Sequence, residues 1–277
     1  MKTTFFKLTG VALPVSLFIS ACGISAPFIG GSQEKNSLTG SPGSNGKVLA
    51  VKIDDTPPAH PQIGLASADV VYVEQVEGGL TRIAAIFSSK IPENIGPVRS
   101  ARISDLDILA QYGKVAFAYS GAQTAFRPRI KQANLIDLSA EHEPPTIYFR
   151  DPSKEAPTNM ILNAPALLTK AEKEGAAIES AKSVGWEFGN KPDNGKEIIS
   201  ATVRWPASRY TFTWSTKEER WLISYHDQPN VDSTGFQLGP KTVLIQLVSI
   251  VDSEYHDKFG GITPSSKTVG VGFRSEE

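Results

Sequence analysis

The sequence predicts an α+β or α/β N-terminal domain followed by a smaller, mainly antiparallel β C-terminal domain. Between residues 47 and 188, short apolar runs alternate with segments of helical spacing. From residue 196 to 277, short strand-like runs are separated by turn residues, and no long helical pattern intervenes. The chain has 277 residues, of which 40% are hydrophobic and 21% charged, an ordinary globular composition.

Strands open the first domain. Residues 48–53 form an apolar run that the segment Asp54-Asp55-Thr56-Pro57-Pro58 closes, because proline cannot continue a strand ladder. Further strands are expected at 70–76, 81–88 and 115–119. The glycine pair Gly78-Gly79 predicts that the first two of these form a hairpin.

Helices are expected at three places. Residues 100–112 carry apolar side chains at helical spacing, and a second helix is expected to end near Ala133. The clearest helix covers 164–182, because Asn163 can cap its first turn and Pro165 fits inside that turn.

The C-terminal domain follows a linker at 189–195. Its strands are expected at 201–205, 209–214, 220–226, 242–251 and 268–273.

The N-terminus has the pattern of a lipoprotein signal peptide over residues 1–22. Lys2 and Lys7 bracket a short charged region, and residues 8–19 then form an apolar segment that is too short to span a bilayer. It ends in Ile19-Ser20-Ala21-Cys22, which resembles the bacterial lipobox, with Cys22 as the lipidated residue. The alternative is a plain signal peptide with an incidental cysteine. We expect a lipid on Cys22 to anchor the chain to the outer face of the bacterial cytoplasmic membrane.

Residues 23–46 are rich in Gly, Ser, Asn and Pro, a composition that predicts a flexible tether. The formal net charge of −1 gives no global reason for nucleic-acid binding. One cysteine excludes an internal disulfide framework and a thiolate zinc cluster, and the four histidines lack zinc-like spacing. We therefore predict neither a metal site nor a cofactor.

Charged residues gather in two segments, 74–82 and 96–102. They comprise Glu74, Glu77, Arg82, Arg99 and Arg102. If residues 99–102 begin a helix, the last two arginines share a face near its N-terminus, where backbone N–H groups and two guanidinium forks favour an anion. The alternative is that these arginines pair with Glu74, Glu77 or Asp105 and lock the helix to the sheet.

Three weaker signals also concern chemistry. Glu74 and Glu77 could act as an acid/base pair only if their strand bends at Gly78, since residues three apart on a strand face opposite sides. Ser120 lies between small residues after a strand, but capping the next helix is its more usual role. Asn159 belongs to a polar, proline-containing loop that turn chemistry alone can explain.

Several segments resemble the YerB-like bacterial lipoproteins. They are Val51-Lys52-Ile53-Asp54, Val76-Glu77-Gly78-Gly79, Gly96-Pro97-Val98-Arg99-Ser100-Ala101-Arg102, Ala156-Pro157-Thr158-Asn159 and Gly235-Phe236-Gln237-Leu238. The resemblance implies a lipid-anchored, two-domain extracytoplasmic protein and brings no agreed reaction. Proteins of this kind continue beyond residues 268–272 into further strands, so we expect a truncated C-terminal domain with an unpaired edge or an exposed apolar face.

Three function classes follow. The favoured one is a binding or adaptor module in which Arg82, Arg99, Ser100 and Arg102 hold an anionic envelope component such as a phosphorylated glycan, a wall polymer or a peptide carboxylate. The second is a hydrolase or transferase acting on a phosphate or glycosidic bond, with Glu74, Glu77 or Asp105 as acid or base. The third is an adaptor that contacts another envelope protein.

Overall fold

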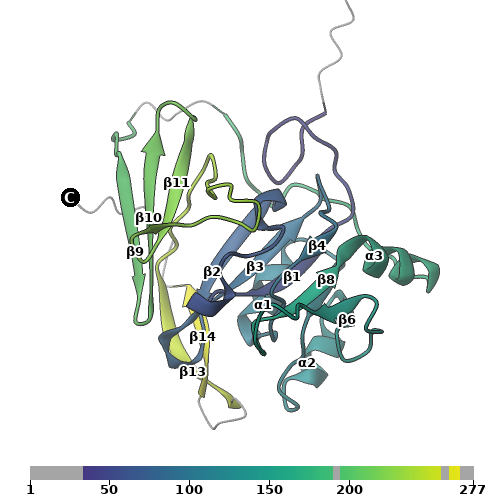
Figure 1. Ribbon diagram of the computed structural model, residues 1–277. Helices are drawn as coiled ribbons and strands as arrows, with labels where there is room; N and C mark the ends of the chain where they lie inside the picture. The colour runs from purple at the N-terminus through teal and green to yellow at the C-terminus, as the bar shows by residue number, and fades with distance from the viewer. Residues whose placement is uncertain (1–33, 190–193, 257–261, 269–277) are drawn as a thin grey trace, which may run out of the picture. The chain divides into compact units, whose positions relative to one another are not determined.

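The computed structural model describes residues 34–189, 194–256 and 262–268. Its central feature is a mixed five-stranded sheet with the order β2-β3-β1-β5-β6 (Figure 1). The strands are β1 (Leu49–Asp54), β2 (Val70–Gln75), β3 (Thr81–Phe87), β5 (Val115–Tyr119) and β6 (Leu135–Ser139). The strands β2, β3 and β1 run antiparallel to one another, whereas β1, β5 and β6 run parallel.

Both faces of this sheet are covered, which explains why β1, β3 and β5 are buried along their whole length and mostly apolar. Strand alternation puts Leu49, Val51 and Ile53 into one core cluster. Ala50 belongs to a second cluster on the opposite face. The same alternation brings Lys52 onto that second face, as a charged side chain in an apolar strand.

Three helices and a small sheet complete the first domain. Their bounds are α1 (Ile103–Ala110), α2 (Arg127–Gln132), α3 (Ala164–Lys173), β4 (Asn94–Ile95), β7 (Tyr148–Arg150) and β8 (Met160–Asn163). Three short 3₁₀ turns lie at η1 (Pro57–Ala59), η2 (Leu65–Ser67) and η3 (Glu77–Gly79). The order of the small sheet is β4-β8-β7.

The helices are shorter than the sequence predicts. The cap of α3 is confirmed, because Asn163 Oδ1 accepts a hydrogen bond from the Ala166 N–H at 3.0 Å. The predicted extension to residue 182 is wrong: α3 ends at Lys173, and Gly175 follows with φ of +85°, a typical helix-stop conformation. The second predicted helix is reduced to the six residues of α2. The first, α1, begins three residues later than expected, at Ile103.

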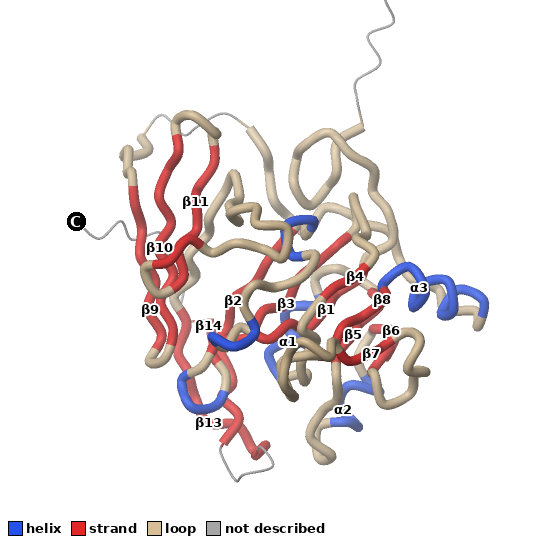
Figure 2. The backbone as a smooth tube through the Cα atoms, in the orientation of Figure 1, coloured by secondary structure: helices blue, strands red, loops and turns tan. Residues whose placement is uncertain are grey.

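The C-terminal region contains an antiparallel four-stranded sheet and a two-stranded hairpin (Figure 2). The described residues after α3 contain no helix. The sheet, ordered β12-β11-β10-β9, comprises β9 (Ser200–Trp205), β10 (Ser208–Ser215), β11 (Arg220–Tyr225) and β12 (Gln228–Pro229). The hairpin pairs β13 (Val248–His256) with β14 (Ile262–Thr268). Residues 242–247 are not in the strand expected there, because β13 begins at Val248. The strand predicted at 268–273 lies almost wholly outside the described residues, and β14 was not predicted.

The predicted tether is partly wrong. Leu38 is only 2% exposed and belongs to the second core cluster. Asn36 is buried too, and its Nδ2 donates to Ser88 Oγ at 2.9 Å. One apolar side chain and one satisfied amide thus fix residues 34–46 against the first domain despite their polar composition. The rest of the tether and the signal peptide, with Cys22, lie outside the described residues.

Asp55 joins the C-terminal sheet to the first domain. Its buried carboxylate accepts hydrogen bonds from the hydroxyls of Tyr210 and Thr81, both at 2.5 Å. Its main-chain carbonyl accepts from the Tyr225 hydroxyl at 2.8 Å. The two tyrosine hydrogen bonds hold the end of β1 against the C-terminal sheet, because the two tyrosines belong to β10 and β11 of that sheet.

Candidate functional site

A cleft of about 900 Å³ lies where the three parallel strands end. Asp54 is the last residue of β1, Ser120 directly follows β5, and Glu141 lies two residues after β6. In α/β sheets, ligands bind outside the carboxyl ends of parallel strands, at the point where strand direction or order changes. Here β1 is that point, because its neighbours are antiparallel β3 and parallel β5.

The segment that carries Arg99 and Arg102 is extended, so the predicted helical arrangement of these arginines is wrong. The Arg99 N–H donates to the Lys52 carbonyl at 2.8 Å, and the Ser120 N–H donates to the Arg99 carbonyl at 2.9 Å. The Ala101 N–H donates to the Gly121 carbonyl at 3.0 Å. These bonds to the ends of β1 and β5 replace helical ones, and α1 begins only after Arg102.

Arg82 lies deep in this cleft. It projects from β3 in register with Asp54 of β1 and Glu74 of β2, and it is only 8% exposed. Its Nη1 donates to the Ser100 carbonyl at 2.8 Å, and within the described residues no carboxylate forms an ion pair with it. Burial lowers the pKa of the Arg82 guanidinium, and the charges of Arg102 and Arg99 lower it further. The site therefore holds a desolvated cation that an added anion would stabilise.

Arg99 and Arg102 also line the cleft but have partners. Arg99 Nε donates to Asp54 Oδ2 at 2.7 Å. Arg102 Nε lies 2.7 and 2.9 Å from the two carboxylate oxygens of Glu77. The pairing of Arg102 with Glu77 is one of the alternatives expected from the sequence. Arg102 Nη1 also donates to the Ala101 carbonyl at 2.9 Å, so this guanidinium is held by main-chain and carboxylate oxygens together.

The turn that supplies Glu77 depends on its glycines. Gly78 and Gly79 have φ of +67° and +69°, a conformation that other residues rarely adopt. This turn joins β2 to antiparallel β3, which confirms the expected hairpin. It also carries Glu77 to the rim of the cleft beside Arg102.

Lys52 lies behind the cleft and is fully buried. Its Nζ contacts the Glu74 carboxylate and lies 2.7 Å from Asp105 Oδ1. Burial lowers the pKa of Lys52 to about 8, against the opposing effect of the Asp105 charge. Asp105 Oδ2 additionally accepts the Arg102 N–H at 2.6 Å and so caps α1. The sequence signal that could have revealed this buried charge group is the presence of a lysine inside the apolar run 48–53.

The acid/base and nucleophile hypotheses gain little from these contacts. Glu74 and Asp105 do not line the cleft, and both are held by Lys52. Ser120 lines it, and its hydroxyl lies 3.4 Å from that of Ser100; the described residues place no imidazole against it. Ser120 does not cap the next helix either, since the N-cap of α2 is Phe126.

Asn159 is not part of the cleft. Its Oδ1 accepts from Arg150 Nη1 at 2.7 Å, and its Nδ2 donates to the carbonyls of Lys154 and Asp151. It thus organises its own loop. Several residues that line the cleft were missed, among them Asp54, Glu141 and Tyr255 of β13. Gln123 was missed too, and its Oε1 is buried without a hydrogen-bond partner.

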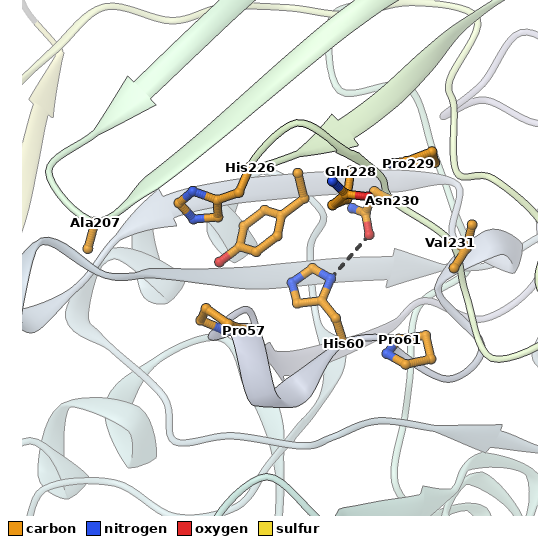
Figure 3. A pocket seen from close by; sticks show the side chains of 10 residues that line it. Pro57, His60, Pro61, Ala207, His226, Gln228, Pro229, Asn230 and Val231 are labelled. Carbon is orange, nitrogen blue, oxygen red and sulfur yellow. Dashed lines mark hydrogen bonds between the residues drawn. The ribbon is translucent and has the colours of Figure 1, made fainter.

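A second cavity of about 510 Å³ lies between the loop after β1 and the turn after β11 (Figure 3). The His60 ring stacks on Tyr225 with centroids 4.1 Å apart, and its Nδ1 lies 3.2 Å from Asn230 Oδ1. Its Nε2 lies 3.3 Å from the Asp55 carboxylate. This mostly apolar cavity is therefore built around the Asp55 network that joins the two domains.

The described residues contain no group of three or more His, Cys, Asp or Glu side chains arranged to hold a metal ion. None of the helices described is both long and apolar enough to cross a bilayer.

Comparison with known proteins supports the sequence resemblance. Residues 38–177 match the family described as "Protein of unknown function (DUF3048) N-terminal domain", and residues 201–274 match its C-terminal domain. The chain is 24% identical over 219 residues to "Putative lipoprotein YerB" of Bacillus subtilis (strain 168), covering 75% of this chain and 62% of the length of that relative. The crystal structure of YerB protein from Bacillus subtilis aligns with a TM-score of 0.67 at 22% identity, covering 83% of this chain and 79% of that one. The predicted fold class and family resemblance are both confirmed.

Proposed function

The chain belongs to the DUF3048 family, and we propose that it is a lipid-anchored extracytoplasmic protein that binds an anionic component of the bacterial cell envelope in the cleft around Arg82. Anchoring is supported by the lipobox-like segment that ends at Cys22 and by the name of the relative, which describes that protein as a lipoprotein. A lipid on Cys22 would hold the domain at the outer face of the cytoplasmic membrane.

The observation that carries the binding proposal is the state of Arg82. A buried guanidinium without a carboxylate partner is costly, and an oxyanion that reaches it forms strong charge-assisted hydrogen bonds. Arg99 and Arg102 line the same cleft, each paired with a carboxylate. Phosphorylated glycans, wall polymers and peptide carboxylates all present such oxyanions.

Catalysis is the less favoured alternative. A hydrolase or transferase needs a carboxyl group that can exchange a proton with the substrate. Glu74, Glu77 and Asp105 are instead engaged by Lys52 or Arg102. These contacts suit a binding site whose charges are fixed in place.

An adaptor role has its own support. Leu244 and Leu247, in the segment before β13, are 61% and 53% exposed, and Ile199 at the start of the C-terminal sheet is 77% exposed. Large apolar side chains that lie together at the surface favour contact with another protein, and Leu244 and Leu247 belong to one short segment. Specific co-purification of an envelope protein, lost on replacing both leucines with Ser, would establish this second role.

The binding proposal is tested by thermal shifts of the full chain in detergent against anionic wall fragments, phosphosugars and muropeptides. A ligand present at 100 times its Kd stabilises the folded state by about 2.7 kcal/mol. We expect Arg82→Gln to abolish the shift, while Arg204→Gln, an exposed arginine of β9, leaves it unchanged. A shift that survives Arg82→Gln would place the site elsewhere, and silence across the panel with a cooperative melt would favour a protein partner.

A further inference from the structure

We infer that the cleft is built for one negative charge, so its ligand is a hydroxyl-bearing monoanion rather than a doubly charged phosphate monoester. The shared chemistry is a singly charged oxyanion flanked by hydroxyl groups, as in an internal phosphodiester of a polyol polymer or the carboxylate of a sugar acid. This inference rests on the proposed anion-binding function and deepens it.

The first argument is the balance of charge around the cleft. Its charged lining residues are Arg82, Arg99, Arg102, Asp54, Glu77 and Glu141. Asp54 pairs with Arg99, Glu77 pairs with Arg102, and Glu141 accepts from Arg127 Nη2 at 2.7 Å. Within the described lining, Arg82 is therefore the one cation without a carboxylate partner.

The layer behind the cleft adds no positive charge. Lys52 lies between Glu74 and Asp105, so that buried group carries one negative charge in excess. A second negative charge on a ligand would find no further unpaired cation among the described lining residues and would approach Asp54 and Glu77 instead. Like charges in a partly desolvated site repel strongly.

The second argument is the donor geometry of Arg82. Only its Nη1 is engaged, by the Ser100 carbonyl, and its other nitrogens have no partner among the described residues. A guanidinium edge binds two oxygens that share one charge, which is the arrangement in both a carboxylate and a phosphodiester.

The third argument concerns hydroxyl groups. Gln123 lines the cleft with a buried Oε1 that has no hydrogen-bond partner. Such an acceptor calls for a donor, and a ligand hydroxyl supplies one. Ser100, Ser120 and Thr124 line the same cleft and offer further neutral hydroxyls. An anion without hydroxyl groups would leave the Gln123 acceptor unsatisfied.

Titration calorimetry on the full chain in detergent at pH 7.5 tests this inference with four probes. Glycerophosphoglycerol and gluconate are hydroxyl-bearing monoanions, glycerol 3-phosphate is close to a dianion, and dimethyl phosphate is a monoanion without hydroxyls. We expect one or both of the first two to bind about tenfold tighter than either of the others. Which of them binds tells the phosphodiester source from the carboxylate source.

Two variants assign the contributions. Arg82→Gln should abolish binding of every probe, and Gln123→Leu should weaken the hydroxyl-bearing monoanion by about tenfold without weakening dimethyl phosphate. Because a phosphate monoester loses its second charge near pH 6, glycerol 3-phosphate should bind more tightly as the pH falls through that value. The phosphodiester should show no such change.

The failures of the two proposals are distinguishable. If glycerol 3-phosphate binds tightest and Arg82→Gln abolishes its binding, the single-charge inference is overturned while the anion site stands. The hydroxyl argument fails if dimethyl phosphate binds as well as glycerophosphoglycerol. If all four probes fail to bind a cooperatively folded chain, both the inference and the anion site are rejected. If Arg82→Gln does not fold, Arg82→Lys takes its place in the binding measurements. This variant keeps the positive charge but lacks the guanidinium edge that binds two oxygens, so it should weaken the binding of the probes.

Discussion

Lys52 shows at the scale of a single residue how the site is held together. It is fully buried and compensates two carboxylates at once, and one of these, Asp105, also caps α1 next to Arg102. Removing one member of such a group leaves a buried charge without a partner. The stability lost in this way is larger than the stability that the intact group contributes. Lys52 thus links the core of the sheet to the loop that carries an arginine of the cleft.

We predict that Lys52→Met lowers the free energy of unfolding by roughly 3–5 kcal/mol, because Glu74 and Asp105 lose their shared cation. Urea unfolding measures this loss. A triple variant that also carries Glu74→Gln and Asp105→Asn should recover much of it. A loss as small as that of a surface substitution, within about 0.5 kcal/mol, would contradict the assigned role.

The pH dependence of stability follows from the same residue. Burial lowers the pKa of Lys52 from 10.5 to about 8, so between these values the unfolded chain binds the proton more tightly than the folded chain. The contribution of Lys52 therefore makes stability rise with pH across this window. Between pH 8 and 10, the free energy of unfolding should therefore rise more steeply with pH in the wild type than in Lys52→Met. Equal slopes in the two proteins would contradict this contribution.

At the scale of elements, four strands of the central sheet were predicted well, whereas β6 and the small sheet of β4, β7 and β8 were missed. The runs of β1, β2, β3 and β5 were placed within one or two residues, because buried strands read directly as apolar segments. The segment 99–102 was misplaced on a helix, since its partners are main-chain groups of β1 and β5 that no local spacing reveals. The arginines of the cleft were nevertheless predicted, because charged residues cluster next to glycines in the segments 74–82 and 96–102.

The ordered segment 34–46 provides a test at this scale. We predict that Leu38→Ala costs about 2–5 kcal/mol of stability, the usual cost for a buried leucine, because its side chain belongs to the second core cluster. Leu244→Ala, at an exposed leucine, is the control and should have little effect. Equal and small effects in both variants, measured by urea unfolding, would restore the original view of a flexible tether.

At the scale of the whole molecule, contacts between distant parts of the sequence decide the arrangement. Tyr210 reaches Asp55 across 155 residues, and Tyr255 of the C-terminal hairpin packs on Phe126 at the cleft. Neither contact leaves a signal in a single sequence. For this reason the sequence predicted two domains of the right class but not the residues that join them.

We predict that Tyr210→Phe destabilises the chain by about 1–3 kcal/mol, because the buried Asp55 carboxylate loses a donor. Thr213→Val, which removes an exposed hydroxyl from the same strand, should change stability by less than about 0.5 kcal/mol. Burial also raises the pKa of Tyr210 well above 10, so its contribution is full below pH 10 and is lost as the pH rises further. Unfolding measured across pH 9–12 should show a smaller loss in Tyr210→Phe; an unchanged loss would refute this linkage.

The most direct test of the central claim is a crystal structure of the full chain with whichever of glycerophosphoglycerol or gluconate binds more tightly. We predict that two oxygens of the anionic group lie within hydrogen-bond distance of Arg82, and that a ligand hydroxyl donates to Gln123 Oε1. Density for the ligand in the cavity around His60, with Arg82 left untouched, would contradict the claim.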